Sequence, residues 1–336
     1  MVPLITAVVL AAGKGTRMKS DKAKVLHEVF FKPMVHHVLD SIQQIPVQQS
    51  IVIVGHQQER VASSLKEYEY IPVTQQEQLG TGHAVLCTET ACTNAEQVMI
   101  LCGDTPLVRP QMLQALLEQH LDTDATLTLL TTSLDNPFGY GRIVKDALHN
   151  VVEIVEQKDA TPEQQKICEI NAGIYVVKKD FLFSALHQVG TDNSQGEVYL
   201  TDIVSIAVNS GHKVHNFSHP EAIDVLGVNS RVELALAHQE LQKRCNHEFM
   251  LTGITMLSPD TTLVAPTCSI GGDCILYPGI QLTGKTSLGR GCIVNTGAVL
   301  HDCTVADSAV IGAHAVLENC SIDQNERIPP LIHRVG

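Results

Sequence analysis

Residues 5–24, ITAVVLAAGKGTRMKSDKAK, join an apolar segment to a loop that is rich in glycine and in basic residues. The apolar part, residues 5–13, has the continuous hydrophobicity of a strand that is buried on both faces, as in parallel sheets. Gly13 and Gly15 stand at its end, where glycine lets the backbone approach a ligand closely. Exposed amides and nearby cations in such a loop can hold phosphate groups. This stretch therefore predicts a buried strand that ends in a phosphate-binding loop.

Two well-known phosphate-binding templates do not fit this loop. A Walker A loop needs two glycines five positions apart and then Lys followed by Ser or Thr, whereas Gly13 is followed by Lys14 and Gly15. The dinucleotide fingerprint needs a third glycine or alanine where this chain has Met18. The remaining pattern favours a nucleoside triphosphate site of another kind. The alternative is a plain strand-to-helix turn with a solvated basic face.

Strand-like and helix-like segments alternate up to about residue 225. The further expected strands are 50–55, 97–104 and 125–134, and the expected helices are 34–45, 58–68, 80–92 and 110–121. This alternation predicts an α/β, Rossmann-like domain with a mixed, mostly parallel sheet that helices cover on both faces. Ligands of such sheets bind beyond the carboxyl ends of the strands. The segments AAGKGTRM (11–18), GH (55–56) and CGDTP (102–106) lie at such ends.

A repeat of six residues begins at residue 264, after an expected connecting helix over residues 229–251. Its units are VAPTCS, IGGDCI, LYPGIQ, LTGKTS, LGRGCI, VNTGAV, a five-residue unit LHDCT, and then VADSAV, IGAHAV and LENCSI. Each begins with Val, Ile or Leu and most have a small fifth residue, which is the pattern of a left-handed parallel β-helix. Three units close one coil, so ten units predict about three coils. The repeats are expected to stop near Ile322, with residues 323–336 as an end cap.

The repeat also sets the expected domains and the meaning of three cysteines. Cys268, Cys274 and Cys292 occupy the small fifth position, so we expect buried packing residues rather than metal ligands. The expected division is a catalytic-type α/β domain over 1–228, a connecting helix over 229–252 and the short β-helix over 253–336.

Composition excludes several classes of protein. The 36 acidic and 23 basic residues give a formal charge of −13, and aromatic residues make up 4%, so a nucleic-acid partner is not expected. No run approaches 18 apolar residues, so no membrane span is expected. The ten cysteines include no Cys-x-x-Cys, and no signal peptide is recognised. We therefore expect reduced thiols and a cytoplasmic protein.

Longer motifs extend the similarity that begins with AAGKGTRM. They are EQLGTGHA (77–84), LCGDTPL (101–107), FGYGRI (138–143), IVEQKDATPEQ (154–164), EINAGIY (169–175), GEVYLTDI (196–203) and GVNSR (227–231). In this order they resemble the bacterial N-acetylglucosamine-1-phosphate uridyltransferases, the GlmU type, over residues 4–330. The resemblance implies a nucleotidyltransferase domain followed by a β-helix. It also implies that UTP and N-acetylglucosamine 1-phosphate give UDP-N-acetylglucosamine, a cell-wall peptidoglycan precursor, and pyrophosphate.

The resemblance assigns roles to single residues. The sugar phosphate is already an anion, so no general base is needed and catalysis depends on alignment and charge neutralisation. Arg17 and Lys24 are the implied catalytic cations. Asp104 and Asn229 are the implied Mg²⁺ ligands, with a helix N-cap as the alternative role of each. The implied substrate-binding residues are Leu10, Ala11, Ala12, Gly13, Lys24, Gln75, Gly80, Thr81, Gly103, Asp104, Gly141, Glu156, Asn171 and Asn229.

Within this set, the nucleobase and the sugar are expected to contact different residues. The amide of Gln75 can pair with a uracil edge as donor and acceptor. Glu156 and Asn171 suit sugar hydroxyls or the acetamido group, and Tyr199 and Thr201 are expected nearby. Five histidines share no metal-ligand spacing and are expected to be structural or surface residues. They are His27, His36, His37, His56 and His83.

The chain also departs from the family pattern. Ala23 stands where many relatives have Pro, and Cys102 replaces a usual aromatic residue. Counterparts of the acetyltransferase residues are missing, and Glu318 stands where relatives begin an Arg-rich unit. We therefore expect a short form that has no acetyltransferase activity and whose β-helix is a stalk, as a homotrimer or a monomer. Two alternatives remain: a related enzyme with another sugar or nucleotide, and a non-catalytic sensor or scaffold on this fold.

Overall fold

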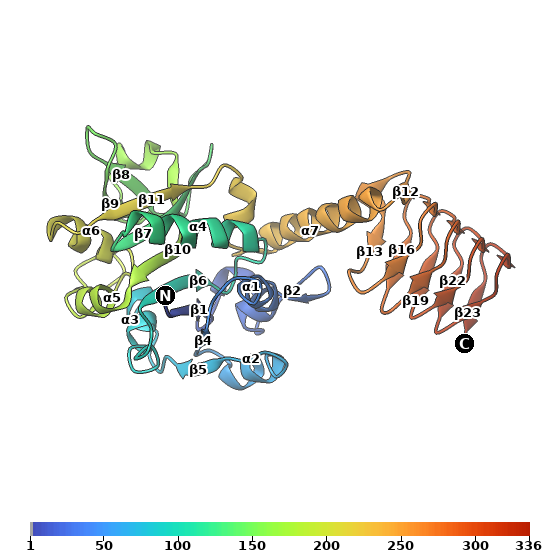
Figure 1. The fold of residues 1–336 in the computed structure, drawn as a ribbon, viewed down its shortest axis with the longest axis horizontal. Helices are drawn as coiled ribbons and strands as arrows, with labels where there is room; N and C mark the ends of the chain where they lie inside the picture. Colours follow the sequence, from blue (N-terminus) through green and yellow to red (C-terminus); the bar gives the residue numbers. More distant parts are fainter. Residues whose placement is uncertain (1–2) are drawn as a thin grey trace. The chain divides into compact units, whose positions relative to one another are not determined.

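The structure, a computed structural model, describes residues 3–336 and divides the chain into two compact units (Figure 1). The larger unit runs to Leu234, except for residues 29–31, which belong with residues 235–336 in the smaller unit. The boundary therefore falls inside the long helix α7 (Arg231–Leu251) rather than at either of its ends.

A nine-stranded mixed sheet forms the centre of the larger unit, as the alternating pattern predicts. Seven strands lie in the order β11-β7-β10-β6-β1-β4-β5, and in this path β10 alone is antiparallel to its neighbours. Two further strands, β8 and β9, extend from β10. A separate ladder joins β2 (Glu28–Val29) and β3 (Lys32–Pro33). The strands of the large sheet are β1 (Ile5–Leu10), β4 (Gln49–Val54), β5 (Ile71–Thr74), β6 (Gln97–Cys102), β7 (Leu127–Ser133), β8 (Arg142–Lys145), β9 (Val151–Val155), β10 (Glu169–Lys178) and β11 (Val214–Ser218).

Helices cover both faces of this sheet, so each central strand is buried on both sides. Alternate residues of β1 point into different hydrophobic cores. Ala7 and Val9 belong to the first core, and Val8 belongs to the second. The first core includes residues of α1 and α4, and the second includes residues of α3, α5 and α6. This two-sided burial explains why the strands are continuously apolar. The helices are α1 (Met34–Ile42), α2 (Gln58–Ser64), α3 (Thr81–Leu86), α4 (Pro110–Thr123), α5 (Lys179–Leu186) and α6 (Asp202–Asn209).

Three predicted helices are shorter than the sequence suggests, and the one predicted over 58–68 ends at Ser64. The predicted helix over 34–45 ends at Ile42, and the last residue of the prediction, Ile45, directly precedes Pro46, which disfavours helical backbone at that position. The predicted helix over 80–92 is an α-helix only to Leu86 and continues as turns. There Thr88 Oγ1 donates to the carbonyl oxygen of Val85 at 2.6 Å, a local bond that competes with the helix.

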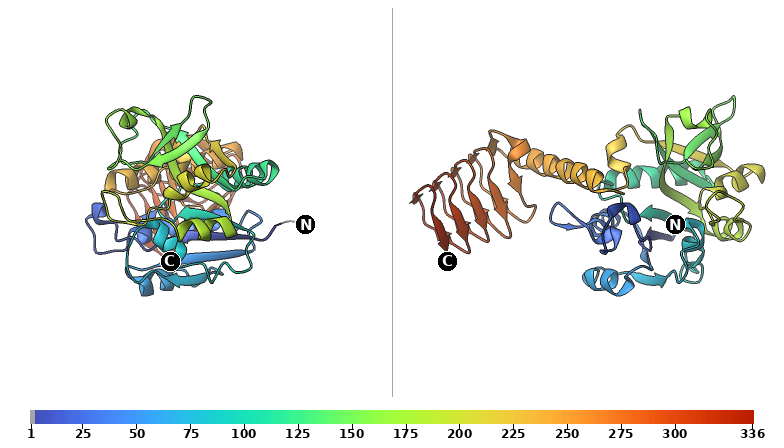
Figure 2. Two further views of the ribbon diagram at one scale, coloured as in Figure 1. Left: turned by 90° about the vertical axis from the view of Figure 1, so that its left-hand side faces the viewer. Right: turned by 180° about the vertical axis from the view of Figure 1, so that it is seen from behind.

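The smaller unit is the predicted left-handed parallel β-helix, with fourteen short strands in three parallel sheets. Figure 2 shows its coils stacked on one another. One sheet contains β12 (Thr255–Met256), β15 (Ile275–Leu276), β18 (Ile293–Val294), β21 (Val310–Ile311) and β24 (Arg327–Ile328). The second contains β13 (Leu263–Val264), β16 (Gln281–Thr283), β19 (Val299–His301), β22 (Val316–Glu318) and β25 (His333–Val335). The third contains β14 (Ser269–Ile270), β17 (Ser287–Leu288), β20 (Thr304–Val305) and β23 (Ser321–Ile322).

The predicted end of the repeats near Ile322 is wrong. Ile322 and Ile328 begin two further units, IDQNER and IPPLIH, and both side chains are buried. Their strands pair in register with the coil before, Ile311 with Ile328 and Leu317 with Arg334. These units lack the small fifth residue, because Glu326 and Ile332 stand there. Residues 323–336 are therefore repeat, and the β-helix has nearly five coils rather than three.

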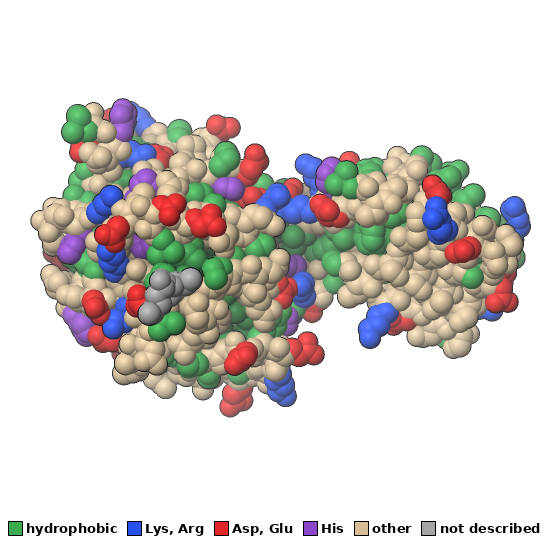
Figure 3. All heavy atoms as spheres, in the orientation of Figure 1, with side chains coloured by type: hydrophobic (Ala, Val, Ile, Leu, Met, Phe, Trp, Pro, Cys, Tyr) green, Lys and Arg blue, Asp and Glu red, His purple; other side chains and the backbone are tan. Residues whose placement is uncertain are grey.

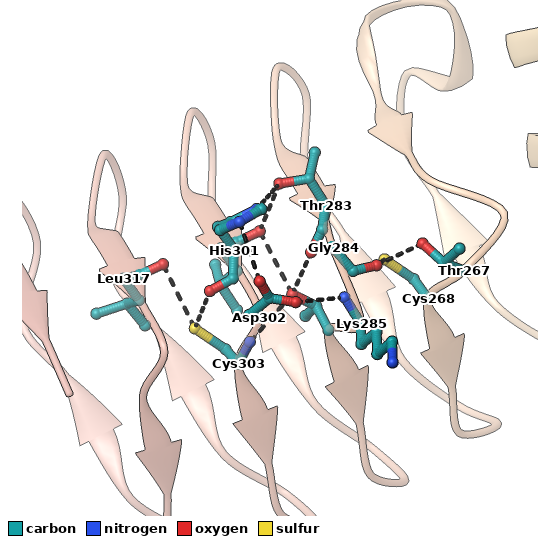
Figure 4. Close-up of polar contacts among 11 residues, drawn as sticks. Thr267, Cys268, Thr283, Gly284, Lys285, His301, Asp302, Cys303 and Leu317 are labelled. Carbon is teal, nitrogen blue, oxygen red and sulfur yellow. Dashed lines mark hydrogen bonds and ion pairs between the residues drawn. The ribbon is translucent and has the colours of Figure 1, made fainter. Parts of the chain in front are cut away.

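A shortened coil accounts for the five-residue unit LHDCT. From Leu263 onward, partner strands are 18 residues apart as far as the pairing of β16 with β19 and 17 residues apart afterwards, which makes LENCS a second five-residue unit. At the first of these corners, Asp302 Oδ1 accepts a hydrogen bond from the backbone N of Lys285 at 2.7 Å (Figure 4). His301 Nδ1 lies 2.9 Å from Thr283 Oγ1 beside it. Side chains of the short coil thus satisfy backbone groups of the coil before.

The cysteines of the β-helix are packing residues, as predicted. Cys274 and Cys292 have no exposed surface and Cys268 is also buried. Their thiols, like those of Cys303 and Cys320, donate to backbone carbonyl oxygens. All ten cysteines of the chain are free thiols.

Surface charge is mixed rather than segregated. On the face shown in Figure 3, Lys and Arg side chains are scattered among Asp and Glu side chains without a continuous basic area. Among residues 3–336, no helix combines the length and the apolar character that crossing a membrane requires.

Candidate active site

A cavity of about 450 Å³ lies in the larger unit at the carboxyl ends of β1, β5 and β6. The loop after β1 forms one wall and residues 75–81 form another. Asp104 follows β6, and Asn229 precedes α7. Ten of the predicted catalytic, substrate-binding and metal-binding residues line this cavity: Leu10, Ala12, Gly13, Arg17, Lys24, Gln75, Gly80, Thr81, Asp104 and Asn229.

Glycine is required in the loop after β1. Gly15 has a φ of 62°, and a Cβ there would lie 2.5 Å from Cβ of Lys24. Because Gly15 has no Cβ, two short 3₁₀ helices can lie directly side by side. One contains Arg17 (Thr16–Met18), and the other begins with Lys24 (Lys24–Leu26). Met18 is fully buried and anchors this loop. The two predicted cations are therefore brought together by a tight backbone approach.

Four predicted residues from distant parts of the chain meet at one end of the cavity. The ammonium of Lys24 forms an ion pair with Asp104 Oδ2 and donates to Asn229 Oδ1 at 2.5 Å. Arg17 Nη2 donates to the same Asn229 oxygen at 2.8 Å. The Lys24 and Asp104 side chains are 13% and 20% exposed, so water screens their charges only partly. Two cations and two oxygen ligands thus share one partly buried site.

Neither Asp104 nor Asn229 is used as a helix cap. The helix after Asp104 is α4, which begins only at Pro110 with Arg109 at its N-cap position. At α7 the hydroxyl of Ser230 accepts a hydrogen bond from the backbone N of Glu233 at 3.3 Å. Asn229 instead donates Nδ2 to the carbonyl oxygen of Gly227 at 3.2 Å, which turns Oδ1 toward the cations. The N-cap alternative for both residues is therefore excluded.

The oxygens of this site suit a hard divalent cation. A carboxylate and an amide oxygen converge on a single positive charge, the Lys24 ammonium, and oxygen ligands of this kind are those that Mg²⁺ takes in proteins. Within residues 3–336 there is no cluster of three or more His, Cys, Asp or Glu side chains that could hold a metal alone. A cation here would need phosphate oxygens or water as its remaining ligands.

The opposite wall is fixed by close backbone packing. Gly80 has a φ of 109°, and a Cβ there would lie 2.5 Å from the carbonyl oxygen of Val198. That same carbonyl accepts the backbone N of Gly82 at 2.8 Å, and the backbone N of Val198 donates to Leu79 at 2.8 Å. The segment GEVYLTDI therefore holds EQLGTGHA in place. Gln75, which is buried, donates Nε2 to the carbonyl oxygen of Gly80 at 3.1 Å.

Three of the four residues predicted to bind the sugar, Gly141, Glu156 and Asn171, form a second group outside the cavity lining, whereas the fourth, Asn229, lines the cavity. A Cβ on Gly141 would lie 3.5 Å from Glu156 Oε1 and 3.6 Å from Cβ of Asn171, so the three residues adjoin. Burial raises the pKa of Glu156, and Thr201 Oγ1 donates to its Oε1 at 3.3 Å. The hydroxyl of Tyr199 bonds with Asp159 and Gln195 instead.

Two predicted binding residues have mainly structural contacts. Ala11 is buried in the first core, and its backbone N donates to the carbonyl oxygen of Ile53. The backbone N of Gly103 donates to Leu10 at 2.9 Å, and a Cβ on Gly103 would lie 3.0 Å from that Leu10 oxygen. Cys102 lines the cavity, and burial raises the pKa of its thiol to about 12, so the side chain stays neutral.

Several residues near the site were not assigned a role from sequence. Burial, with the charges of Glu233 and Asp104 as the next causes, raises the pKa of Tyr140 to about 12, so its hydroxyl stays neutral. Arg142 is fully buried, donates to the carbonyl oxygen of Tyr140 and donates to Gln157 Oε1 at 2.7 Å. Both residues belong to FGYGRI, so the motif was visible although these contacts were not. His83, expected to be structural or at the surface, contacts the predicted base-binding Gln75.

Comparison with known proteins covers both units. Residues 7–166 match the family model of the MobA-like NTP transferase domain. A protein of Desulfotalea psychrophila named "Bifunctional protein GlmU" is 48% identical over 326 residues, 97% of this chain and 96% of that protein. Proteins of the same name from Exiguobacterium sibiricum and Trichlorobacter lovleyi are 44% and 41% identical over 329 residues. These matches cover 97% of this chain and 73% and 72% of those proteins, respectively.

Proposed function

This chain belongs to the GlmU family of sugar-1-phosphate nucleotidyltransferases, and from that premise we propose that it is a Mg²⁺-dependent uridylyltransferase. Its substrates are UTP and N-acetyl-α-D-glucosamine 1-phosphate, and its products are UDP-N-acetylglucosamine and pyrophosphate. The observation that supports this most directly is the meeting of Arg17, Lys24, Asp104 and Asn229 at one end of the 450 Å³ cavity.

The reaction needs charge control more than proton transfer. A phosphate oxygen of the sugar substrate forms a bond to the α-phosphorus of UTP, and the bond from that phosphorus to the bridging oxygen breaks. Pyrophosphate leaves with the electron pair, and no proton moves in this step. Arg17 and Lys24 supply positive charge where phosphate oxygens gather, which is the main form of catalysis open to such a site.

The pairing of Lys24 fits this role. Its ammonium is held by Asp104 and Asn229, so it is oriented before any substrate arrives. A divalent cation held by Asp104 and Asn229 would neutralise charge on the phosphate oxygens. The Lys24 ammonium would then be left to donate to the phosphates themselves.

Acetyl transfer and oligomeric state are separate proposals. We propose that the chain does not acetylate glucosamine 1-phosphate, because the residues expected for that step have no counterparts and Glu318 stands at the start of the expected basic unit. We also propose a homotrimer through the β-helix. Thiol release from acetyl-CoA with glucosamine 1-phosphate would refute the first proposal, and a monomer mass in light scattering would refute the second.

A pyrophosphate-release assay tests the main proposal. It crosses UTP, dTTP, CTP and ATP with the 1-phosphates of N-acetylglucosamine, glucosamine and glucose, with and without excess chelator. We expect the highest kcat/KM for UTP with N-acetylglucosamine 1-phosphate, and loss of turnover with chelator that Mg²⁺ restores. A preference for glucose 1-phosphate or dTTP would identify a related enzyme of different specificity.

A further inference from the structure

The side chain of Gln75 is fixed in one orientation by two hydrogen bonds. Its Nε2 lies 3.1 Å from the carbonyl oxygen of Gly80 and 3.1 Å from His83 Nδ1. A carbonyl oxygen can only accept, so the amide nitrogen rather than the amide oxygen must face Gly80. The side-chain amide has two N–H donors, and these two contacts use both of them.

The amide oxygen of Gln75 is therefore the group left for a ligand. Gln75 lines the cavity, and no donor among residues 3–336 bonds to its Oε1. The second bond also defines the histidine tautomer. Because Nδ1 accepts from Gln75, the ring proton of neutral His83 is on Nε2, which lies 4.0 Å from the sulfur of Cys87.

The backbone supports this arrangement. Gly80 adopts a conformation open only to glycine and is wedged against Val198, so its carbonyl oxygen cannot turn away from Gln75. His83 lies on the first turn of α3, which begins directly after Gly80. The two acceptors of the Gln75 amide, the carbonyl oxygen of Gly80 and Nδ1 of His83, therefore belong to one tightly packed turn at the start of α3.

We propose that His83 is a positioning residue for nucleotide specificity, which fixes the Gln75 amide so that only its oxygen faces the nucleobase. This inference rests on the proposed function. An oxygen acceptor pairs with the N3–H of uracil, whereas cytosine presents an acceptor at N3. Cytosine would then leave two acceptors facing each other at a side chain that is itself buried, and a site built to bind an N–H discriminates strongly against a ligand without one.

The test compares kcat/KM for UTP and CTP, with N-acetylglucosamine 1-phosphate, in three variants. The wild type is expected to prefer UTP by at least about 100-fold. His83→Leu removes the acceptor and should lower this preference at least about 10-fold, mainly through a higher KM for UTP, since the base is remote from the reacting phosphorus. His83→Asn can present an oxygen near the Nδ1 position and should keep the preference within about 3-fold of the wild type. His187→Leu changes an exposed histidine of the same unit and should leave the preference unaltered.

An unchanged UTP preference in His83→Leu would overturn the proposal, and so would equal losses in the Leu and Asn variants. A measurement on the wild type does not depend on how the variants fold. 3-Deazauridine triphosphate has C–H in place of N3–H, and its binding in an equilibrium titration should be at least about 10-fold weaker than that of UTP. Equal binding would also overturn the proposal. Absence of UTP turnover by a wild type that still binds UTP better than CTP would contradict the proposed reaction but not the base contact.

Discussion

Two aspartates show how differently the two units of this chain use the same side chain. Asp302, in the β-helix, accepts a hydrogen bond from the backbone of the neighbouring coil, so its carboxylate is part of the fold (Figure 4). Asp104, in the α/β unit, follows β6 and has a lysine ammonium as the partner of its side chain. In the β-helix the polar side chain completes the backbone bonding, whereas in the α/β unit it forms an ion pair beside the cavity, where we propose that it binds a metal. Substitutions at the two positions should therefore have opposite consequences for stability and activity.

The largest effect is expected from removing positive charge at the cavity. Lys24→Ala should lower kcat/KM for uridylyl transfer by about 10³-fold, because a preorganised donor to the phosphates is lost. Lys24→Arg keeps the charge with a different shape and should lose less activity than the alanine variant. Both variants can be measured by steady-state pyrophosphate release. Wild-type activity in Lys24→Ala would contradict the proposed catalytic role of this residue.

A core substitution in the β-helix should change stability without changing chemistry. Leu300 is fully buried, and Leu300→Ala should lower the free energy of unfolding by about 3 kcal/mol in denaturant titrations. The kcat should stay at the wild-type value under native conditions, because the predicted site residues all lie in the other unit. Leu257, 55% exposed, is the matched control, and Leu257→Ala should cost less than about 0.5 kcal/mol. Loss of activity in folded Leu300→Ala would show coupling between the units.

Acid should destabilise the α/β unit through a buried histidine. Burial, with Lys178 as the next cause, lowers the pKa of His120 to about 4, and its ring nitrogens bond to Thr128 Oγ1 and Gln97 Oε1. Because the unfolded chain binds this proton near pH 6.5 and the folded chain does not, stability falls as the pH drops from 6.5 to 4. The loss from this group approaches about 3 kcal/mol and does not grow below pH 4.

Denaturant titrations between pH 8 and pH 4 measure this dependence. His120→Gln should reduce the slope of stability against pH in that window, whatever its stability at pH 8. An unchanged slope in His120→Gln would contradict the assignment.

The smallest effect is expected at Asp302. Asp302→Ala removes the acceptor for the backbone N of Lys285 and should cost about 1 kcal/mol of stability, with uridylyl transfer unaltered. Asp302 has a φ of 50°, which Asn also tolerates, and the Asn side chain keeps an oxygen acceptor. Asp302→Asn should therefore stay close to the wild type in thermal unfolding. Equal destabilisation by Ala and Asn would indicate that the negative charge matters more than the hydrogen bond.

Hydrophobic periodicity predicted most of the fold. It failed in the last two units of the β-helix, where several residues depart from the repeat pattern. The strands of the large sheet and the coils from 264 onward have regular hydrophobic spacing. The last two units of the β-helix were missed because Leu331, rather than glycine or asparagine, adopts a φ of 60° and because Glu326 and Ile332 are large. Stacking on the preceding coil determines the structure of these units, and the local sequence pattern does not predict it.

The site was predictable as a set of residues but not as a geometry. The meeting of Lys24 with Asp104 and Asn229 joins positions that are up to 205 residues apart, which spacing along the chain cannot reveal. The motifs indicated these residues through family resemblance. The contact of His83 with Gln75 had no separate signal, because a histidine three residues after a glycine is common on a helix surface. Packing of Gly80 and Gly82 against Val198 instead holds the segment that carries His83.

The central claim is that Asp104 holds the metal and phosphate end of an active uridylyltransferase site. The most direct test measures Mg²⁺-dependent release of pyrophosphate from UTP and N-acetylglucosamine 1-phosphate by the wild type and by Asp104→Ala. Asp302→Ala serves as the control for loss of a carboxylate elsewhere. We expect wild-type turnover that rises with Mg²⁺, near-complete loss in Asp104→Ala and full activity in Asp302→Ala. Mg²⁺-dependent turnover that Asp104→Ala retains would contradict the account.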